Sequence, residues 1–491
     1  MIYKTLWAYS IKFKGDQFEK LNPRWCLVGK HMDRNLYESF SDTVRWTSMV
    51  VIFTIRAYYV VVDFHFDVGN AFQATQTGDN ARSQSVIERK RRLFGEMPPG
   101  FAEKGRDGRA KVCEFFVAFQ GTVDAANLFG CEITHDLLAD AGCTRSVWDP
   151  ELWLLHHGPT VKTETDLVKI LAACADVPAS AGAPPGWAVF GRHVDDGAGV
   201  ASSQRVIDHL QHVLSAGWNI KLSRWKKVLG FDITIKDESN RSTVVVSGLA
   251  AMQRMFAAHA EGEMVIKPRH PYPSNINEVT YAPLPAEDSP EYATTLALHE
   301  QHRSGLGFSV RVMRAHVQLV YPTSRLCAYA SAPSAFNHKV WKQSIMYELA
   351  HPQPYTVGGV FDRQSLSISS DPHMPFASRA YELGFHVMED ANLGTIKPSQ
   401  DTDLVPIASG SSDAAARAAA RSVTGVVGML GGAPLFTVAV RQHLVVPEVH
   451  TSELHAAGTA VQLAISHAGV LQEVGILQLS PTPIFSDSQS T

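Results

Sequence analysis

The chain has 491 residues, of which 45% are hydrophobic and 19% are charged, and its formal net charge is −4 at pH 7. This composition excludes an intrinsically disordered protein, and the length predicts a folded chain of two to four domains. The small net charge gives no global attraction to nucleic acid, so binding of that kind would need a local basic groove.

The six cysteines are scattered and include no Cys-x-x-Cys pair. Their spacing argues against a zinc module and a disulfide framework, so we expect reduced thiols without disulfide partners. The N-terminal residues lack the layout of a signal peptide. The most apolar run, residues 49–64, contains Arg56 and Asp63, and we expect it to form a buried strand or helix rather than a membrane span. We therefore expect an intracellular protein, cytoplasmic or nuclear and not secreted.

Near the N-terminus, a strand is expected at residues 24–28, and a second, strongly patterned one begins at residue 59. In the second strand apolar and polar side chains alternate, and this period of two places Asp63, His65 and Asp67 on one face. Asp67 ends the strand. A carboxylate at a strand end is well placed to meet an acidic turn of a neighbouring strand.

Two apolar runs flank the sequence Asp195-Asp196-Gly197. Asp-Gly between strand-like segments predicts a β-hairpin, because the turn needs a positive φ and glycine supplies it. Two carboxylates at the tip of a hairpin suit a divalent cation that prefers oxygen ligands. A solvated surface turn is the plainer alternative for this short motif taken alone.

The rest of the chain predicts mixed α and β structure, with residues 267–291 as the best linker candidate. Helices are expected at residues 115–139, 203–217, 305–350 and 451–471. Strands are expected at residues 225–233, 385–390, 423–430, 435–440 and 483–487, with a Gly431-Gly432 hairpin between the third and fourth of them. Three acids, Asp390, Glu453 and Asp487, then lie at the ends of these elements.

In their order along the chain, these motifs resemble the reverse transcriptase–RNase H part of copia-type retrotransposon polyproteins. Each short motif is weak alone, but the shared order is specific and covers nearly the whole chain. The matching segments are residues 67–72, 97–101, 111–113, 148–150, 193–196, 229–233, 390–394, 421–425, 451–453 and 486–490.

The resemblance implies an α+β right-hand polymerase fold followed by an α/β RNase H-like domain. Fingers, palm and thumb would occupy residues 1–260, and a linker and connection region would occupy residues 261–380. The RNase H-like domain would occupy residues 381–491, and we expect it to be truncated at its C-terminal end.

The implied activity is RNA-directed DNA synthesis by two-metal phosphoryl transfer, with an RNA template, a DNA primer and deoxynucleoside triphosphates as partners. Asp67, Asp195 and Asp196 would hold two Mg²⁺ ions, with Mn²⁺ as the alternative. The resemblance also implies a second set of metal ligands for RNA cleavage, namely Asp390, Glu453 and Asp487.

Three further residues are implied to contact the nucleotide or the primer. Arg24 would reach the incoming triphosphate. Phe72 lies where the family has an aromatic gate against ribonucleotides, although core packing is an equal alternative for it. His193 replaces the tyrosine that precedes Val-Asp-Asp in the family.

Two departures from the family keep other interpretations open. One is the expected truncation of the RNase H-like domain, and the other is residues 120–127, which lack two cations and a proline of the family's pattern. Loss of these cations weakens phosphate contacts. The main alternative is therefore a catalytically decayed retroelement relic that keeps the fold and at most binds nucleic acid. An unrelated metal-dependent phosphohydrolase would leave the order of the motifs unexplained.

Overall fold

The computed structural model divides the chain into two compact units. Unit 1 contains Met1–Ile52 and Val61–Trp225, and unit 2 contains Phe53–Val60 and most of the chain after Trp225. The structure describes residues 2–14, 17–32, 39–77, 80–87, 92–156, 186–238, 242–259, 268–358, 383–392, 422–442, 449–476, 478 and 481–486.

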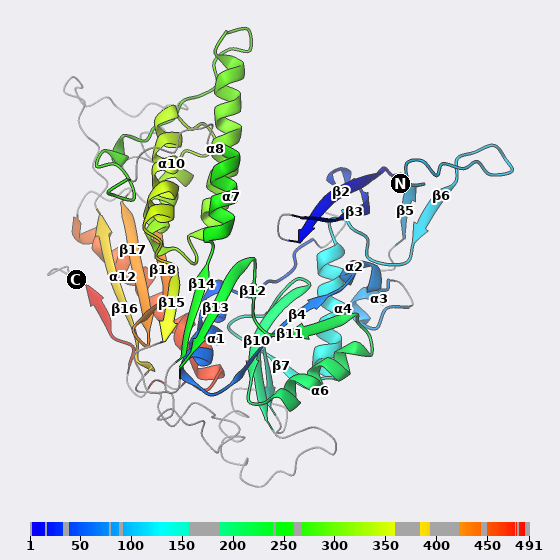
Figure 1. Cartoon of the computed structure of the whole chain (residues 1–491), viewed down its shortest axis with the longest axis horizontal. Coiled ribbons are helices and arrows are strands. Elements are labelled where there is room, and N and C mark those ends of the chain that lie inside the picture. Colours follow the sequence, from blue (N-terminus) through cyan, green and yellow to red (C-terminus); the bar gives the residue numbers. More distant parts are fainter. Residues whose placement is uncertain are drawn as a thin grey trace. The chain divides into compact units, whose positions relative to one another are not determined.

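Unit 1 is built around a six-stranded sheet of order β11-β4-β10-β9-β8-β7, in which all neighbouring strands are antiparallel (Figure 1). Its strands are β4 (Val62–Val68), β7 (Cys143–Arg145), β8 (Leu152–His156), β9 (Trp187–His193), β10 (Asp196–Ala201) and β11 (Ile220–Ser223). Two helices, α4 (Ala125–Ala139) and α6 (Gln204–Ser215), supply apolar side chains to the core on one face of this sheet.

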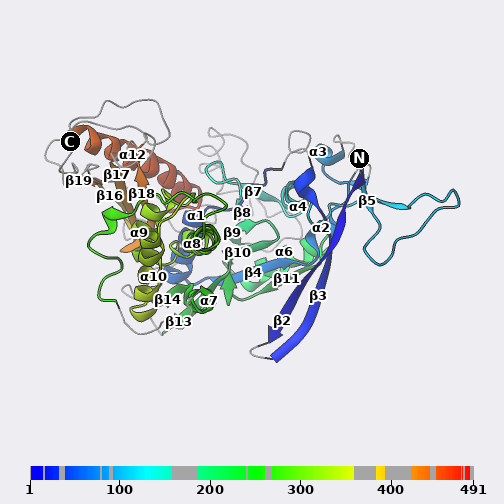
Figure 2. The same cartoon turned by 90° about the horizontal axis from the view of Figure 1, so that it is seen from above.

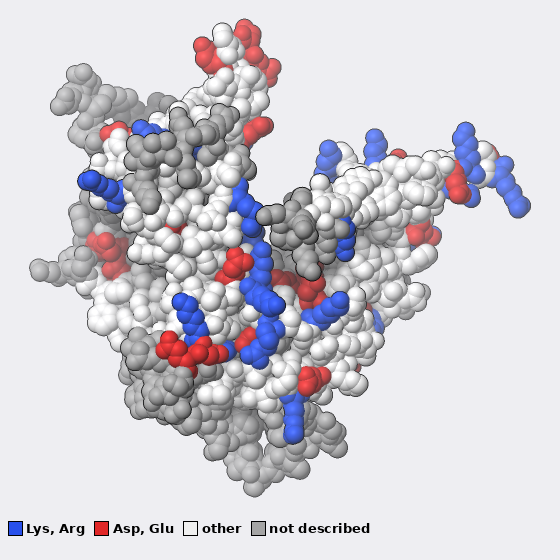
Figure 3. Space-filling model, in the orientation of Figure 1, with Lys and Arg blue, Asp and Glu red and all other residues white. Residues whose placement is uncertain are grey.

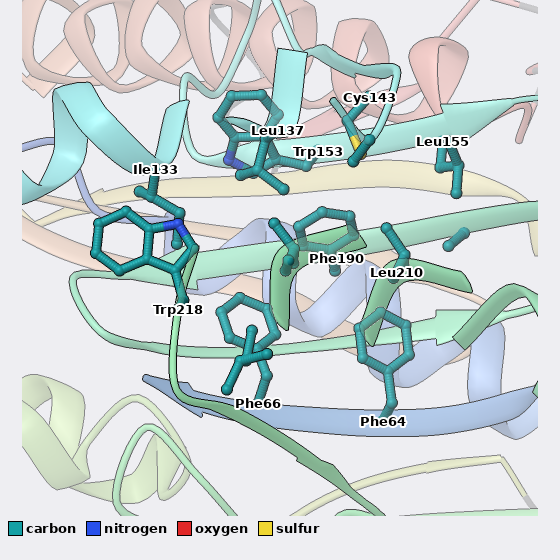
Figure 4. Packing of buried hydrophobic residues seen from close by; sticks show 14 of the residues in the cluster. Phe64, Phe66, Ile133, Leu137, Cys143, Trp153, Leu155, Phe190, Leu210 and Trp218 are labelled. Atoms are coloured by element: carbon teal, nitrogen blue, oxygen red, sulfur yellow. The ribbon is translucent and has the colours of Figure 1, made fainter. Parts of the chain in front are cut away.

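Burial of aromatic side chains fixes which face of β4 points to these helices. Phe64 and Phe66 lie in the core with Phe190 of β9, at ring-centroid separations of 5.9 and 6.0 Å (Figure 4). Each fully buried phenylalanine contributes about 1.5–3 kcal/mol relative to an exposed one. Because side chains alternate along a strand, His65 and Asp67 lie on the opposite face, as the sequence predicts.

The remaining strands of unit 1 form two smaller sheets. A three-stranded sheet contains β1 (Ile2–Tyr3), β5 (Leu93–Glu96) and β6 (Val112–Phe115). The second is a long two-stranded hairpin of β2 (Thr5–Lys14) and β3 (Gln17–Leu27), whose strands run side by side in Figure 2. The strand predicted at residues 24–28 is the end of β3.

The short helical segments of unit 1 are η1 (Gly29–His31), α2 (Ala71–Ala74) and α3 (Gln84–Ile87). A longer helix, α1 (Trp46–Tyr58), begins in unit 1 and ends in unit 2. The apolar run at residues 49–64 therefore forms most of the buried helix α1 and the start of β4. Within the described residues, no helix combines the length and the apolar character needed to cross a membrane.

After Trp225, unit 2 contains a four-stranded sheet and a group of helices. The strands are β12 (Lys227–Val228), β13 (Phe231–Asp237), β14 (Ser242–Ser247) and β15 (Tyr355–Gly358). The helical elements are α7 (Leu249–His259), η3 (Ile276–Glu278), α8 (Tyr292–Val312), η4 (Val317–Leu319), α9 (Val320–Cys327) and α10 (Ala335–Ala350). The helices pack around the fully buried Trp341.

A second four-stranded sheet of order β18-β17-β16-β19 lies near the end of the chain, and α12 (Val449–Glu473) packs against it. Its strands are β16 (Phe385–Asn392), β17 (Val423–Leu430), β18 (Ala433–Arg441) and β19 (Ile484–Ser486). The predicted hairpin is confirmed, because Gly431 and Gly432 take φ angles of 56° and 78° between β17 and β18. β19 runs parallel to β16.

Two predicted helices have the wrong bounds. The helix expected at residues 115–139 begins only at Ala125, because Phe115 ends β6 and packs with Phe119 and Trp25 in a separate aromatic cluster. The stretch expected to be helical at residues 305–350 is divided among several helices, the first of which already starts at Tyr292. The domain bounds at residues 260 and 380 stay predictions.

The helical core of unit 2 contains a cluster of buried histidines. His299 and His302 lie on α8 and His338 lies on α10, with the rings of His302 and His338 5.9 Å apart. Burial, followed by the proximity of His338 and His299, lowers the pKa of His302 from its ordinary value of 6.5 to about 4. The folded state therefore keeps this ring neutral.

We expect the free energy of unfolding to fall as the pH drops from 6.5 towards 4. In that range the unfolded chain binds a proton at residue 302 that the folded chain does not, so the slope approaches about 1.4 kcal/mol per pH unit. Urea unfolding of wild type and His302→Phe at pH 7.5 and 5 measures this. The variant should lose part of the pH dependence, whereas His270→Gln, at an exposed position, should keep all of it. Equal slopes in wild type and His302→Phe would contradict the prediction.

Candidate active site

The Asp195-Asp196-Gly197 segment forms the predicted hairpin, but the turn lies earlier than expected. His193 of β9 pairs with Asp196 of β10, so Val194 and Asp195 are the two turn residues. The positive φ belongs to Val194, at 59°, and not to Gly197. A β-branched residue in this region is a conformational outlier, with a strain of about 1–3 kcal/mol.

Gly197 is needed for packing rather than for the turn. It lies opposite Phe66 in the register of β10 and β4. A Cβ at position 197 would come within 2.1 Å of the Phe66 ring. Because backbone and ring are both buried in the sheet, only glycine fits under this ring without a shift of β10.

A row of four charged or titratable side chains crosses the end of the sheet. Lys221 of β11 is paired with Asp67 of β4, Asp67 with Asp196 of β10, and Asp196 with His193 of β9. Residues directly opposite each other in antiparallel strands point to the same face, with Cβ atoms about 4.5–5.5 Å apart. All four side chains thus lie on the face that points away from α4 and α6. The sequence predicted Asp67, Asp196 and His193 here but not Lys221.

Asp195 lies beside this row in the turn. Its carbonyl oxygen accepts a hydrogen bond from the backbone N–H of Val68, at 3.0 Å, which ties the turn to the end of β4. Burial raises the pKa of the Asp195 carboxyl, and the negative charges of Asp67 and Asp196 raise it further. A hydrogen bond from its own backbone and the nearby His193 act in the opposite direction.

His65 holds the carboxylate of Asp196. Its Nε2 atom lies 2.5 Å from Asp196 Oδ1, and the two side chains are 21% and 31% exposed. A carboxylate can only accept hydrogen bonds, so Nε2 carries the proton. The bond fixes the direction of the Asp196 carboxylate and engages one of its two oxygens. The sequence placed His65 on this face but gave it no role.

The donor chemistry of the row fits a hard divalent cation. Among the described residues, no group of three or more His, Cys, Asp or Glu side chains is close enough to hold a metal ion. Mg²⁺, however, is commonly bound by one or two carboxylates together with water and substrate phosphates. Asp67 and Asp196 supply such a pair. Burial is the main cause of the raised pKa of Asp195, and a bound cation would oppose the smaller contribution that comes from the charges of Asp67 and Asp196.

A buried ion pair lies under the turn on the helix-covered face. Arg192 donates two hydrogen bonds to Glu151, each of 2.7 Å, and both side chains are 1% exposed. Arg192 Nη1 also donates to the carbonyl oxygen of Val194, at 3.2 Å. Its guanidinium lies 5.9 Å from the ring of Phe129 on α4. The sequence pattern did not predict this pair, because its members are 41 residues apart in the chain.

The predicted nucleotide contacts lie on other elements of unit 1. Arg24 is exposed on β3, in the two-stranded hairpin, opposite Ala8. Phe72 is half-buried on α2, directly after β4, and its ring packs edge-on against Phe129 at a centroid distance of 6.4 Å. His193 is exposed in the row described above. Of these three residues, His193 belongs to the row. Arg24 lies in a different sheet, and Phe72 lies on α2.

Basic side chains on the surface of unit 1 are interspersed with acidic ones. In Figure 3, Lys and Arg lie around the loop between β5 and β6, at the right of the view, beside Asp and Glu. In this region Lys111 pairs with Glu103 at 2.7 Å, and Arg92 pairs with Glu114 at 2.9 Å. The sequence also contains a basic run at residues 89–92, and residues 88–91 lie outside the described residues.

Two of the three acids expected near the C-terminus lie in the described part of the chain. Asp390 is exposed on β16, and Glu453 is buried near the start of α12. Asp487 lies outside the described residues. A common site for the whole trio therefore stays a prediction.

The alternation of β16 explains the separation of Asp390 from α12. The ring of Phe385 lies 6.5 Å from His467 of α12, so Phe385 and every second residue after it point to the helix. Glu389 is one of these residues and is buried, whereas Asp390 points to the other face. The period of two in residues 385–391 would have identified Glu389 as the acid on the helix side.

Comparison with known proteins finds distant structural similarity. The chain is similar to a solved structure of the foamy viral protease-reverse transcriptase in complex with double-stranded DNA, with a TM-score of 0.40 and 11% sequence identity. The match covers 98% of this chain and 58% of that chain, so this chain spans less than two thirds of the neighbour's length. No family model matches the chain, and no curated protein matches it at a significant level.

We expect Asp195→Asn to stabilise the fold in metal-free buffer at neutral pH. A raised carboxyl pKa means that the ionised form is less favourable in the folded than in the unfolded state, so stability is lost as the pH rises through that pKa. Asparagine stays neutral, and the gain should be about 0.5–2 kcal/mol, the usual range for a stabilising substitution.

Thermal unfolding at pH 8 and pH 4 measures this effect. The gain should be present at pH 8 and shrink at pH 4, where more of the wild-type carboxyl is neutral. Glu300→Gln, at an exposed position of α8, is the matched control and should change little at either pH. A variant less stable than wild type at pH 8 would show that the Asp195 carboxylate stabilises the fold instead.

Proposed function

We propose that the chain is an RNA-directed DNA polymerase whose active site contains Asp67, Asp195 and Asp196. The observation that carries the proposal is the register of β4 and β10, which sets Asp67 opposite Asp196 next to a strained turn holding Asp195. Local strain of this kind is concentrated at functional sites. The order of the sequence motifs, which resembles copia-type elements, supplies the type of reaction.

The chemistry required is displacement at phosphorus, in which negative charge grows on the attacking and leaving oxygens. Bound Mg²⁺ or Mn²⁺ would stabilise both oxygens. Asp67, Asp195 and Asp196 would hold the metal, and His65 keeps the Asp196 carboxylate in one orientation. Lys221, next to Asp67, adds a cation that suits a phosphate group of the nucleotide or primer.

For residues 381–491 we propose an RNase H-like α/β layout. The support is the sheet of three antiparallel strands with a fourth strand parallel to the first, covered by α12. The proposal does not extend to RNA cleavage, because Asp390 points to the face of β16 that is turned away from α12, the helix that carries Glu453. The competing function, nucleic-acid binding by a decayed relic, draws its support from the altered residues 120–127.

We expect the wild-type chain to extend an oligo(dT) primer on poly(rA) with Mg²⁺ or Mn²⁺. Asp67→Asn and Asp195→Asn should reduce extension to the level without enzyme, because each removes a carboxylate from the proposed metal site. The matched control is Asp208→Asn, at an exposed position of α6, which should extend at the wild-type rate. Primer–template binding without extension by the wild type would favour the relic instead.

Phe72 provides a test of nucleotide selection. If its ring excludes the ribose 2′-hydroxyl, Phe72→Ala should increase ribonucleotide incorporation relative to deoxynucleotide incorporation by about tenfold or more. Phe72→Tyr keeps the ring and should keep the selectivity. Single-nucleotide incorporation with dTTP and UTP measures the ratio. A Phe72→Ala variant that is less stable but equally selective would assign Phe72 to core packing against Phe129.

A further inference from the structure

The turn before Asp195 holds a conformation that valine does not adopt by itself. Val194 has a φ of 59°, in the left-handed region that disfavours β-branched side chains. Such a residue persists only where its surroundings over-determine it. On one side, the Val68 N–H binds the carbonyl of Asp195. The carbonyl of Val194 itself is held by Arg192.

The geometry of Arg192 is fixed by Glu151. Nε and Nη2 of Arg192 bind the two carboxylate oxygens of Glu151 in a fork, which leaves Nη1 directed at the Val194 carbonyl. The backbone N–H of Arg192 also donates to the Glu151 carbonyl, at 2.9 Å. Because the guanidinium is planar, two fixed nitrogens determine the direction of the third.

Glu151 is in turn held by two other donors. Trp153 Nε1 binds Oε2 at 3.3 Å, and Arg145 Nη2 binds Oε1 at 3.0 Å. The carboxylate thus accepts four hydrogen bonds and has little freedom to rotate. A buried ion pair is weak evidence for a contribution to stability, because desolvation opposes the attraction of the charges. Its placement against the strained turn gives it a different role.

We propose that Arg192 is a positioning residue that holds the Val194–Asp195 turn, and thereby the Asp195 carboxylate, in its working orientation. The inference rests on the proposed polymerase function for its catalytic consequence. Its structural part, the restraint of the turn, can be measured without activity. The Val68 amide is the reporter, because its acceptor is the Asp195 carbonyl in the turn.

The first experiment compares Arg192→Lys with Arg145→Lys. Both remove a guanidinium from Glu151, but only Arg192 contacts the turn. Arg192→Lys should speed hydrogen exchange at the Val68 amide and lower the rate of single-nucleotide addition, each by about tenfold, as expected for one hydrogen bond from a charged group. Arg145→Lys should stay within about twofold of wild type in both. Equal effects of the two variants, or none, would overturn the proposal.

A second variant separates the turn from the stability of the fold. Arg192→Met with Glu151→Gln removes both buried charges and keeps an acceptor for Trp153 and Arg145, so the protein should remain folded. Exchange at Val68 should still be faster and nucleotide addition slower, with little change in primer–template affinity. Wild-type exchange and addition in this folded variant would overturn the role of Arg192.

Relief of strain supplies the rescue. Glycine adopts a positive φ without penalty, so adding Val194→Gly to Arg192→Lys should recover much of the lost addition rate, and no recovery would overturn the proposal. If the wild type itself fails to extend a primer, the proposed function fails, and exchange at Val68 alone then decides whether Arg192 restrains the turn.

Discussion

The register between β4 and β10 is the constraint on which the candidate site depends. It sets Asp67 opposite Asp196 on the face of the sheet that points away from α4 and α6, and Phe66 opposite Gly197 on the face toward these helices. A slip of one residue would turn Asp67 into the core and Phe66 outward. The register is secured from the apolar side, because only the hydrogen at position 197 leaves room for the Phe66 ring. Core packing thus determines where the acids lie.

Several features of the site oppose folding. Three carboxylates lie near one another, a valine takes a left-handed conformation, and a charged pair is buried under the turn. The aromatic core around Phe190 and Phe129 on the other face offsets these terms, since each of its large side chains is almost fully buried. A stable apolar layer beneath a strained polar edge is the arrangement expected where function and stability compete.

Local patterns in the sequence predicted the parts of the site that depend on residues close together in the chain. The alternation along β4 placed His65 and Asp67 on one face, and the acidic pair at residues 195–196 predicted a hairpin. The position of the turn was wrong, because the need for Gly197 comes from a ring on another strand and not from its φ angle. The Arg192–Glu151 pair was also missed, since its members are neighbours only in the folded chain. Pairing across strands is a non-local choice that one sequence does not reveal.

This edge of the sheet is positive at one end of the row and negative in the middle, because Lys221 lies next to Asp67 and Asp196. The row ends at His193. Strands are about 4.8 Å apart, so the sign of the fixed charge reverses over a single strand spacing. A polyanion approaching this edge meets attraction at β11 and repulsion at β4 and β10. Small cations experience the opposite pattern. The edge therefore favours anions at β11 and small cations at β4 and β10. Both preferences weaken as the ionic strength rises, because salt at 0.1 M screens charges over roughly 10 Å.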